Sequence, residues 1–176
     1  KSFERVFDQT ESDLDMKLVY DVAHNIAKVE KHKVDGEERK LVVHRKGATR
    51  AFPSNRNEIP SKYRDLGQPV LVPGSMGTSS WILLGKSNSM DLSFGSTAHG
   101  AGRTMSRSKA RRNFTEDYVK KSLNDKGIFI KALTRDGVVE ETPEAYKDVD
   151  SVVNVSHNLG IATKVAKLVP IGVIKG

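Results

Sequence analysis

The sequence predicts a single α+β domain, in which short strands and helices interleave without the regular period of a parallel βαβ fold. The chain has 176 residues, of which 37% are hydrophobic and 29% charged, and this is enough to build one domain around a hydrophobic core. Turn signals rich in glycine and proline separate the apolar segments, and there is neither an internal repeat nor a low-complexity segment. We therefore expect mixed sheets with interleaved helices and no internal domain boundary.

The first predicted elements are a helix, a strand and a hairpin. Residues 2–16 carry apolar side chains at roughly helical spacing, which predicts an amphipathic helix. These side chains are Phe3, Val6, Phe7 and Leu14. Residues 17–23 are rich in Leu, Val and Tyr and predict a strand. Residues 25–34 and 39–44 flank Asp35-Gly36, the best short hairpin signal of the chain.

The middle of the chain predicts an irregular stretch followed by two strands. Residues 47–67 contain two prolines and several basic side chains, which favours irregular structure. Residues 69–72 and 79–84 predict short strands. Between them lies Pro73-Gly74-Ser75-Met76-Gly77, whose composition is typical of a tight turn.

Helices and strands alternate in the last third of the chain. Residues 104–112 predict the start of a basic helix, and residues 114–123 predict a second helix with Thr115 as its N-cap. Residues 128–133 predict a strand, and Pro143 suits the first position of a short helix. The last predicted elements are a helix over 149–159 that ends at Gly160, and one or two strands over 165–174.

Charge and composition narrow the class of protein. The formal net charge of +7 is compatible with a polyanionic partner, above all nucleic acid. The chain has no cysteine, which excludes disulfides and thiolate metal sites within it. There is neither an apolar run of the roughly 18 residues that a membrane span needs nor a signal-peptide pattern, so we expect a cytoplasmic protein. Because the chain begins at Lys1 without a methionine, we expect it to be part of a longer protein.

The segment Gly95-Ser96-Thr97-Ala98-His99-Gly100-Ala101-Gly102-Arg103 carries the clearest chemical signal. Glycines let a backbone approach a phosphate closely, and successive amide groups can form an anion-binding concavity. The imidazole of His99 can act as a nucleophile, and Arg103 offers charge-assisted hydrogen bonds to phosphate oxygens. The pattern favours a phosphate-handling histidine loop, although a surface histidine without function gives the same local pattern.

The other histidines carry weaker signals. His24 stands at a strand end beside Asn25, where it is either a metal ligand or a structural histidine. His32 is expected in a solvated hairpin arm, and His44 either contacts RNA or phosphate or is simply exposed on a strand. His157 is expected to pack or cap a helix. The sequence has no HExxH motif, P-loop or Ser-His-Asp motif, and no complete metal site is evident.

Basic side chains gather directly after the histidine loop. They are Arg103, Arg107, Lys109, Arg111 and Arg112. On a helix, positions 103, 107 and 111 fall on one face, at i, i+4 spacing. A second basic group is His44-Arg45-Lys46 with Arg50. A charge run next to a candidate phosphate loop favours a groove that follows a nucleic-acid backbone, whereas most charge runs are solvated faces.

Four sequence strings together resemble one family. They are VAHN, VLVPGSMGTSSW, GSTAHGAGR and the final Lys-Gly, and they resemble the C-terminal portion of an RtcB-type RNA-splicing ligase. The resemblance extends along essentially all of residues 1–176, and the N-terminal half of such a ligase is absent from the chain. It implies the C-terminal portion of a single RtcB-like ligase domain.

The resemblance implies an enzyme that joins RNA 2′,3′-cyclic phosphate or 3′-phosphate ends to 5′-hydroxyl ends, as in tRNA splicing and RNA repair. It implies GTP and Mn²⁺ as cofactors, RNA as substrate and an archease-type activating protein as a partner. His99 would be the catalytic nucleophile that carries GMP as a phosphoramidate. His24 would bind manganese and also lie at the nucleotide.

The resemblance also implies the remaining site residues. Asn25 would contact a nucleotide phosphate, Ser80 and Lys175 would hydrogen-bond guanine, and Tyr146 would stack on the base. The other implied nucleotide contacts are Pro73, Gly74, Ser75, Met76, Gly100, Ala101 and Gly102. The implied RNA-phosphate contacts are Lys46, Arg103 and Arg107.

Because further metal ligands of the family lie in its N-terminal half, we expect this chain alone not to ligate RNA. Two alternatives stay open at this point. One is a non-catalytic RNA-binding module whose glycine-rich loop only holds phosphate, and the other is a GTP-binding regulatory module.

Overall fold

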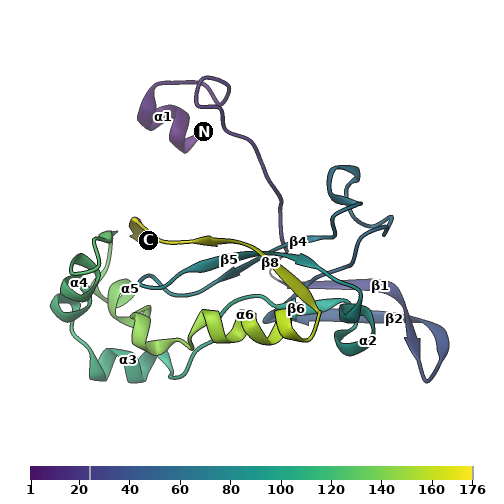
Figure 1. Cartoon of the computed structure of the whole chain (residues 1–176). Helices are drawn as coiled ribbons and strands as arrows, with labels where there is room; N and C mark the ends of the chain where they lie inside the picture. Colours follow the sequence, from purple (N-terminus) through teal and green to yellow (C-terminus); the bar gives the residue numbers. More distant parts are fainter. Residues whose placement is uncertain (24, 176) are drawn as a thin grey trace.

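The computed structural model describes residues 1–23 and 25–175 (Figure 1). In chain order the elements are α1 (Ser2–Phe7), β1 (Asn25–Val34), β2 (Glu37–Lys46), β3 (Ala48–Arg50), the 3₁₀ helix η1 (Ser61–Tyr63), β4 (Pro69–Pro73), β5 (Ser80–Gly85), α2 (Asn88–Ser93), β6 (Ser96–Ala98), α3 (Arg107–Asn113), α4 (Glu116–Asn124), β7 (Phe129–Ala132), α5 (Arg135–Glu140), the 3₁₀ helix η2 (Pro143–Ala145), α6 (Val149–Asn158), β8 (Ala162–Leu168) and β9 (Gly172–Lys175). This mixture of helices and small sheets confirms the predicted α+β class. Within the described residues, no helix is both long and apolar enough to cross a membrane.

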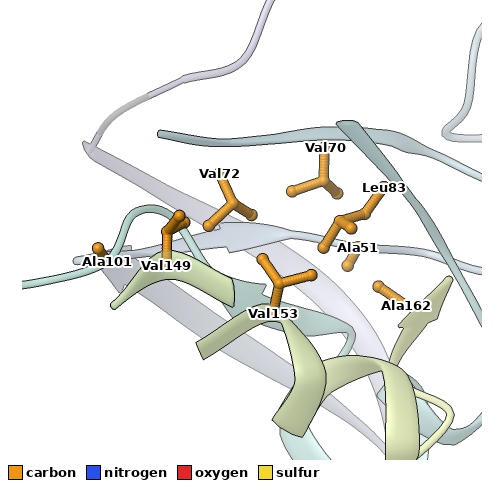
Figure 2. Close-up of a cluster of buried hydrophobic side chains, with 8 residues drawn as sticks. All are labelled: Ala51, Val70, Val72, Leu83, Ala101, Val149, Val153 and Ala162. Atoms are coloured by element: carbon orange, nitrogen blue, oxygen red, sulfur yellow. The ribbon is translucent and has the colours of Figure 1, made fainter. Parts of the chain in front are cut away.

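A three-stranded antiparallel sheet forms the centre of the molecule. β5 lies between β4 and β8, and α6 runs alongside the sheet (Figure 1). Val149 and Val153 of α6 form one buried cluster with Val70, Val72 and Leu83 of the sheet (Figure 2). Burial of a side chain of this kind contributes about 1.5–3 kcal/mol. This cluster fixes the ends of β4 and β5, between which the 73–80 turn begins.

A second apolar cluster lies behind that turn. It contains Val119 and Leu123 of α4, Val138 of α5, Ile128 before β7, and Met76 of the turn itself. Thr115 caps α4 as predicted, because its hydroxyl accepts a hydrogen bond from the backbone N–H of Tyr118 at 3.3 Å. The turn is therefore held by buried packing as well as by its two strands.

The hairpin of β1 and β2 confirms the turn signal in the sequence. The strands pair from Asn25 opposite Lys46 to Val34 opposite Glu37, and Asp35 and Gly36 both have positive φ. Two such residues in succession match the twist of the strands. After β2 the chain continues into β3, where Ala48 pairs with Ala98 of β6.

The inner face of the hairpin holds a buried ionic cluster of Glu30, His32 and Arg45. Arg45 donates to both carboxylate oxygens of Glu30 at 2.8 and 2.7 Å, and His32 Nε2 lies 3.0 Å from Glu30 Oε2. Arg45 also donates to Ser96 Oγ and to the carbonyl oxygen of Phe94, each at 2.7 Å. The expectation that His32 is solvated is therefore wrong, because strand alternation turns it inward with its carboxylate partner.

The N-terminal segment differs from its prediction. Of residues 2–16, only α1 (Ser2–Phe7) is helical, and α1 stands apart from the body (Figure 1). The helix ends at Asp8, which has a φ of 51°. Thr10 and Asp13 then bond each other through backbone and side chain, which competes with a helix. Residues 17–23 form no strand, because no other segment pairs with them among the described residues.

Candidate functional site

A polar cavity of about 240 Å³ brings together most of the residues that the sequence analysis assigns to a nucleotide. Its wall comes from the 73–80 turn, the residue after α5, the residue after η2, and β9. Seven predicted residues line it: Pro73, Gly74, Ser75, Met76, Ser80, Tyr146 and Lys175. Glu141, Val173 and Ile174 complete the wall. These segments are far apart in the sequence, so the cavity is a product of the fold.

The turn between β4 and β5 is closed by its own hydrogen bonds. Ser75 N–H donates to Thr78 Oγ1 at 2.7 Å, and Gly74 N–H donates to the Ser79 carbonyl at 3.1 Å. A Cβ atom on Gly74 would collide with the Ser79 carbonyl oxygen and with Thr78 Oγ1. Glycine is therefore required for the turn to close this tightly beside the cavity.

The histidine loop is tied to the cavity wall on both sides. His99 follows β6 directly and is half-buried. Ala101 N–H donates to the Pro73 carbonyl at 2.9 Å, and Lys147 N–H donates to the Gly102 carbonyl at 2.9 Å. Gly102 has a φ of 75°, which favours glycine. The loop thus lies between the turn and the Tyr146 segment, although His99 and residues 100–102 do not themselves line the cavity.

Tyr146 is held in the cavity wall by two charged neighbours. Its hydroxyl donates to Glu141 Oε2 and accepts from Arg103 Nη1 at 3.0 Å. The Arg103 guanidinium also lies over the Tyr146 ring, 4.8 Å from the ring centroid. Burial and the neighbouring Glu141 carboxylate raise the pKa of the Tyr146 hydroxyl above its ordinary value. The hydroxyl therefore keeps its proton at neutral pH.

All of the nitrogens of the Arg103 guanidinium donate hydrogen bonds within the chain. Nε donates to the Met105 carbonyl at 3.0 Å, Nη2 donates to the Glu140 carbonyl at 2.6 Å, and Nη1 reaches Tyr146 and Glu141. This arrangement favours a supporting role for Arg103 against Tyr146, outside the residues that line the cavity. The RNA contact that the resemblance implies for Arg103 stays a prediction. Sequence reasoning missed Glu141, since the helix that precedes it, α5, was not predicted.

Lys175 reaches the cavity from the last described strand. β9 pairs with β7 in parallel, with Lys175 opposite Ala132, and the Leu133 N–H donates to the Lys175 carbonyl at 3.1 Å. The side chain of Lys175 is half-buried. Its backbone is therefore fixed by the sheet, and the residue lines the cavity.

Asn25 and Lys46 lie in a separate group at the base of the hairpin. They pair across β1 and β2, and His44 Nε2 lies 2.8 Å from Asn25 Oδ1. Two residues after Lys46, Ala48 pairs with Ala98, which precedes His99. The hairpin base therefore approaches the histidine loop from the side of β6. His24, the predicted metal ligand, lies outside the described residues.

Three of the basic residues after the loop meet acidic partners on α5 or directly after it. Helix α3 begins at Arg107, so Arg103 precedes it, yet both arginines lie 3.4 Å from Glu141 Oε1. Arg111 pairs with Glu140. Arg107 stays the more accessible, with 65% of its side chain exposed against 23% for Arg103. Arg45 of the second basic group is buried against Glu30 and is not part of a surface.

The described residues contain no group of three or more His, Cys, Asp or Glu side chains that could hold a metal ion. They therefore do not form a metal site by themselves. The expectation that His157 packs in the helix interface is wrong, because its side chain is exposed in the last turn of α6.

Comparison with known proteins identifies a family. A family model described as tRNA-splicing ligase RtcB matches residues 1–176. The chain is 52% identical over 176 residues to a protein named tRNA-splicing ligase RtcB from Nanoarchaeum equitans, and the match covers all of this chain and 37% of that protein. Proteins of the same name from Thermococcus kodakarensis and Archaeoglobus fulgidus are 54% and 55% identical over 176 residues, again over all of this chain and 36% of each protein. The chain thus spans little more than a third of the length of these relatives.

Proposed function

The chain belongs to the RtcB family of tRNA-splicing ligases, and from this premise we propose that the complete protein joins RNA ends with GTP and Mn²⁺ through a GMP–histidine intermediate. We propose further that the chain forms the C-terminal portion of a single ligase domain. The observation that carries the proposal is the cavity, in which seven residues predicted to contact the nucleotide share one wall beside the His99 loop.

In the first step, an imidazole nitrogen of His99 attacks the α-phosphorus of GTP. A P–N bond forms, the bond to the β-phosphate oxygen breaks, and pyrophosphate leaves with the electron pair. The loop supports this step because the Ala101 and Lys147 backbone bonds fix its position relative to the turn and to Tyr146. Tyr146 is proposed to stack on the base, while Ser80 and Lys175 hydrogen-bond its edge.

In the later steps, an oxygen of the RNA 3′-phosphate attacks the phosphorus of GMP, and the P–N bond to His99 breaks. The RNA 5′-hydroxyl then attacks the activated 3′-phosphate, and GMP leaves. A 2′,3′-cyclic phosphate end must first be opened by water to the 3′-phosphate. Arg107 and Lys46, both exposed and basic, are proposed to hold the RNA phosphates during these steps.

Mn²⁺ would neutralise charge on the reacting phosphates. We propose His24 as one of its ligands, with Asn25 at a nucleotide phosphate. The described residues contain no cluster of metal-ligating side chains, and we propose that the remaining ligands lie in the N-terminal half of the complete protein, as the resemblance implies. We also propose an archease-type activating protein as a partner, and this part of the proposal is based only on the family resemblance.

Ligation itself tests the proposal against the alternative of a non-catalytic RNA- or GTP-binding module. The complete protein is incubated with GTP, Mn²⁺ and an RNA pair that ends in a 2′,3′-cyclic phosphate and a 5′-hydroxyl. We expect a joined product from the wild type and from His157→Ala, whose histidine is exposed on α6, and none from His99→Ala. RNA binding without any joined product in the wild type would support the non-catalytic module instead.

A further inference from the structure

Glu141 is the one charged residue in the cavity wall to which the proposed function gives no role. It follows α5 directly, lines the cavity with Tyr146 and Lys175, and has 21% of its side chain exposed. Oε2 accepts the hydrogen bond from the Tyr146 hydroxyl. Oε1 lies 3.4 Å from both Arg103 Nη1 and Arg107 Nε. Both carboxylate oxygens are therefore already engaged by protein donors.

The Glu141 carboxylate balances a group of cations. Burial opposes its ionisation, but the hydrogen bond from Tyr146 and the charges of Lys175, Arg103 and Arg107 outweigh burial and lower the pKa of Glu141. Glu141 is thus negative at neutral pH, among three positive side chains. Its negative charge offsets the mutual repulsion of the Lys175 ammonium and the two guanidinium groups.

Glu141 also limits the motion of the Tyr146 ring. The hydroxyl is held at two points, by the carboxylate as acceptor and by Arg103 as donor. The same guanidinium lies over the ring, and the backbone of Arg103 bridges to that of Tyr146. A ring that is fixed before a base arrives loses less conformational entropy when the base stacks on it.

We propose that Glu141 is a positioning residue, which sets the Tyr146 ring for a purine base in the cavity. The inference rests on the proposed function, because it takes the cavity as the GTP site. It differs from a substrate contact, since the Glu141 oxygens face Tyr146 and the arginines. Its loss should weaken capture of GTP and leave the reaction of bound GTP with His99 largely intact.

Three substitutions separate the parts of this role. Glu141→Gln keeps the length of the side chain and removes its charge. Glu141→Asp keeps the charge but shortens the reach to Tyr146 by one methylene. Tyr146→Phe keeps the ring and removes the hydroxyl that Glu141 holds. Glu144→Gln is the matched control, because Glu144 is a nearby acidic residue on η2 that does not line the cavity.

The experiment measures the rate of labelling by α-³²P-GTP at increasing GTP concentrations in the complete protein. We expect Glu141→Gln and Tyr146→Phe to raise the KM for GTP about tenfold, a loss of about 1.4 kcal/mol, with kcat within about twofold of wild type. Glu141→Asp should fall between Glu141→Gln and wild type. The double variant should be little worse than either single variant, because Glu141→Gln weakens the hydrogen bond that Tyr146→Phe removes. Glu144→Gln should match the wild type.

A KM for Glu141→Gln and Tyr146→Phe within twofold of wild type would overturn the inference while the proposed function stood. Loss of kcat with an unchanged KM would overturn it too, because it would place Glu141 in the chemical step. If Glu141→Gln does not fold, as judged by thermal melting, Tyr146→Phe still reports on the shared bond. A wild-type protein that takes up no label and binds no GTP by calorimetry would overturn the proposed function and this inference with it.

Discussion

Lys175, at the end of β9, is the side chain proposed to set the choice of nucleotide. Lys175 lines the cavity, where its ammonium group would donate to the O6 of guanine and repel the amino group of adenine. We predict that Lys175→Ala weakens GTP binding by about 1–3 kcal/mol and erodes the preference for GTP over ATP. Calorimetry of the complete protein with both nucleotides measures this.

The control for Lys175 is Lys131→Ala, an exposed lysine on β7, the strand that pairs with β9. Removing Lys131 changes the charge of the same sheet without touching the cavity. Equal losses of GTP affinity in both variants would mean that only general charge matters, and an unchanged GTP preference in Lys175→Ala would contradict the guanine contact.

Arg107 should act on RNA more than on GTP. It starts α3 beyond the nucleotide loop, its side chain is largely exposed, and its distances to Glu140 and Glu141 are long, at 3.4 Å. Removing one phosphate contact should reduce the salt slope of RNA binding by about one. We therefore predict that Arg107→Ala binds RNA more weakly and with a shallower salt dependence, while GMP uptake is kept.

Filter binding over a series of salt concentrations checks this, with Lys121→Ala on α4 as the control for a lost surface charge. Normal RNA affinity combined with lost GMP uptake would move Arg107 into the nucleotide site instead.

Single residues also show how far the sequence could predict the site. The glycines around His99 and the PGSM turn carry local signals, so they could be singled out before the fold was known. Glu141 and the buried Arg45 could not, because their roles depend on partners between 5 and 51 positions away along the chain. From its charge, Arg45 was predicted to belong to a surface cluster. In the fold it is buried and donates to both carboxylate oxygens of Glu30.

At the scale of elements, the ionic cluster on the hairpin should stabilise the strand that leads to His99. Arg45 connects Glu30 to Phe94 and Ser96, and β6 begins at Ser96. Burial disfavours the charge of Glu30, but its bonds to Arg45 and His32 prevail and lower the pKa of the Glu30 carboxyl from 4.5. A lowered pKa contributes stability that is complete above the unfolded-state value and is lost as the pH falls through the folded-state value.

We predict that Glu30→Gln destabilises the hairpin and β6 at neutral pH, because it leaves the buried Arg45 without its counter-charge. Hydrogen exchange of the complete protein should show faster exchange in the peptide that contains β6. The variant should also lose part of the destabilisation that we expect of the wild type as the pH falls below the ordinary pKa of a glutamate. Glu37→Gln, an exposed carboxylate at the start of β2, is the control. If hydrogen exchange in β6 were unchanged in Glu30→Gln, this would contradict a stabilising link between the ionic cluster and β6.

Elements with strong local signals were predicted from the sequence, and elements without them were not. The hairpin at Asp35-Gly36 and the Thr115-capped helix are confirmed, since turn and cap chemistry act over a few residues. β3 and β6 were not predicted, because each is only three residues long and forms by pairing with the other, which is distant in the sequence. The N-terminal helix was predicted too long, since its apolar spacing continues beyond the polar turn that ends it.

At the scale of the whole molecule, the chain should supply only part of a metal site. The described residues contain no cluster of metal-ligating side chains, and a single imidazole gives little affinity without further ligands in place. We predict weak Mn²⁺ binding by the chain alone and tight binding by the complete protein, with a loss in His24→Ala. Calorimetry measures both, and tight binding by the chain alone would contradict this division.

The most direct test of the account asks where GMP is attached. The complete protein is incubated with GTP and Mn²⁺ without RNA, kept from acid and digested, and the peptide that contains residues 87–103 is sequenced by mass spectrometry. We predict that GMP is attached to His99 and to no other residue, that the adduct is labile to acid, and that it is absent from His99→Ala. GMP on a different residue, or an adduct that persists in His99→Ala, would contradict the assignment of His99 as the nucleophile.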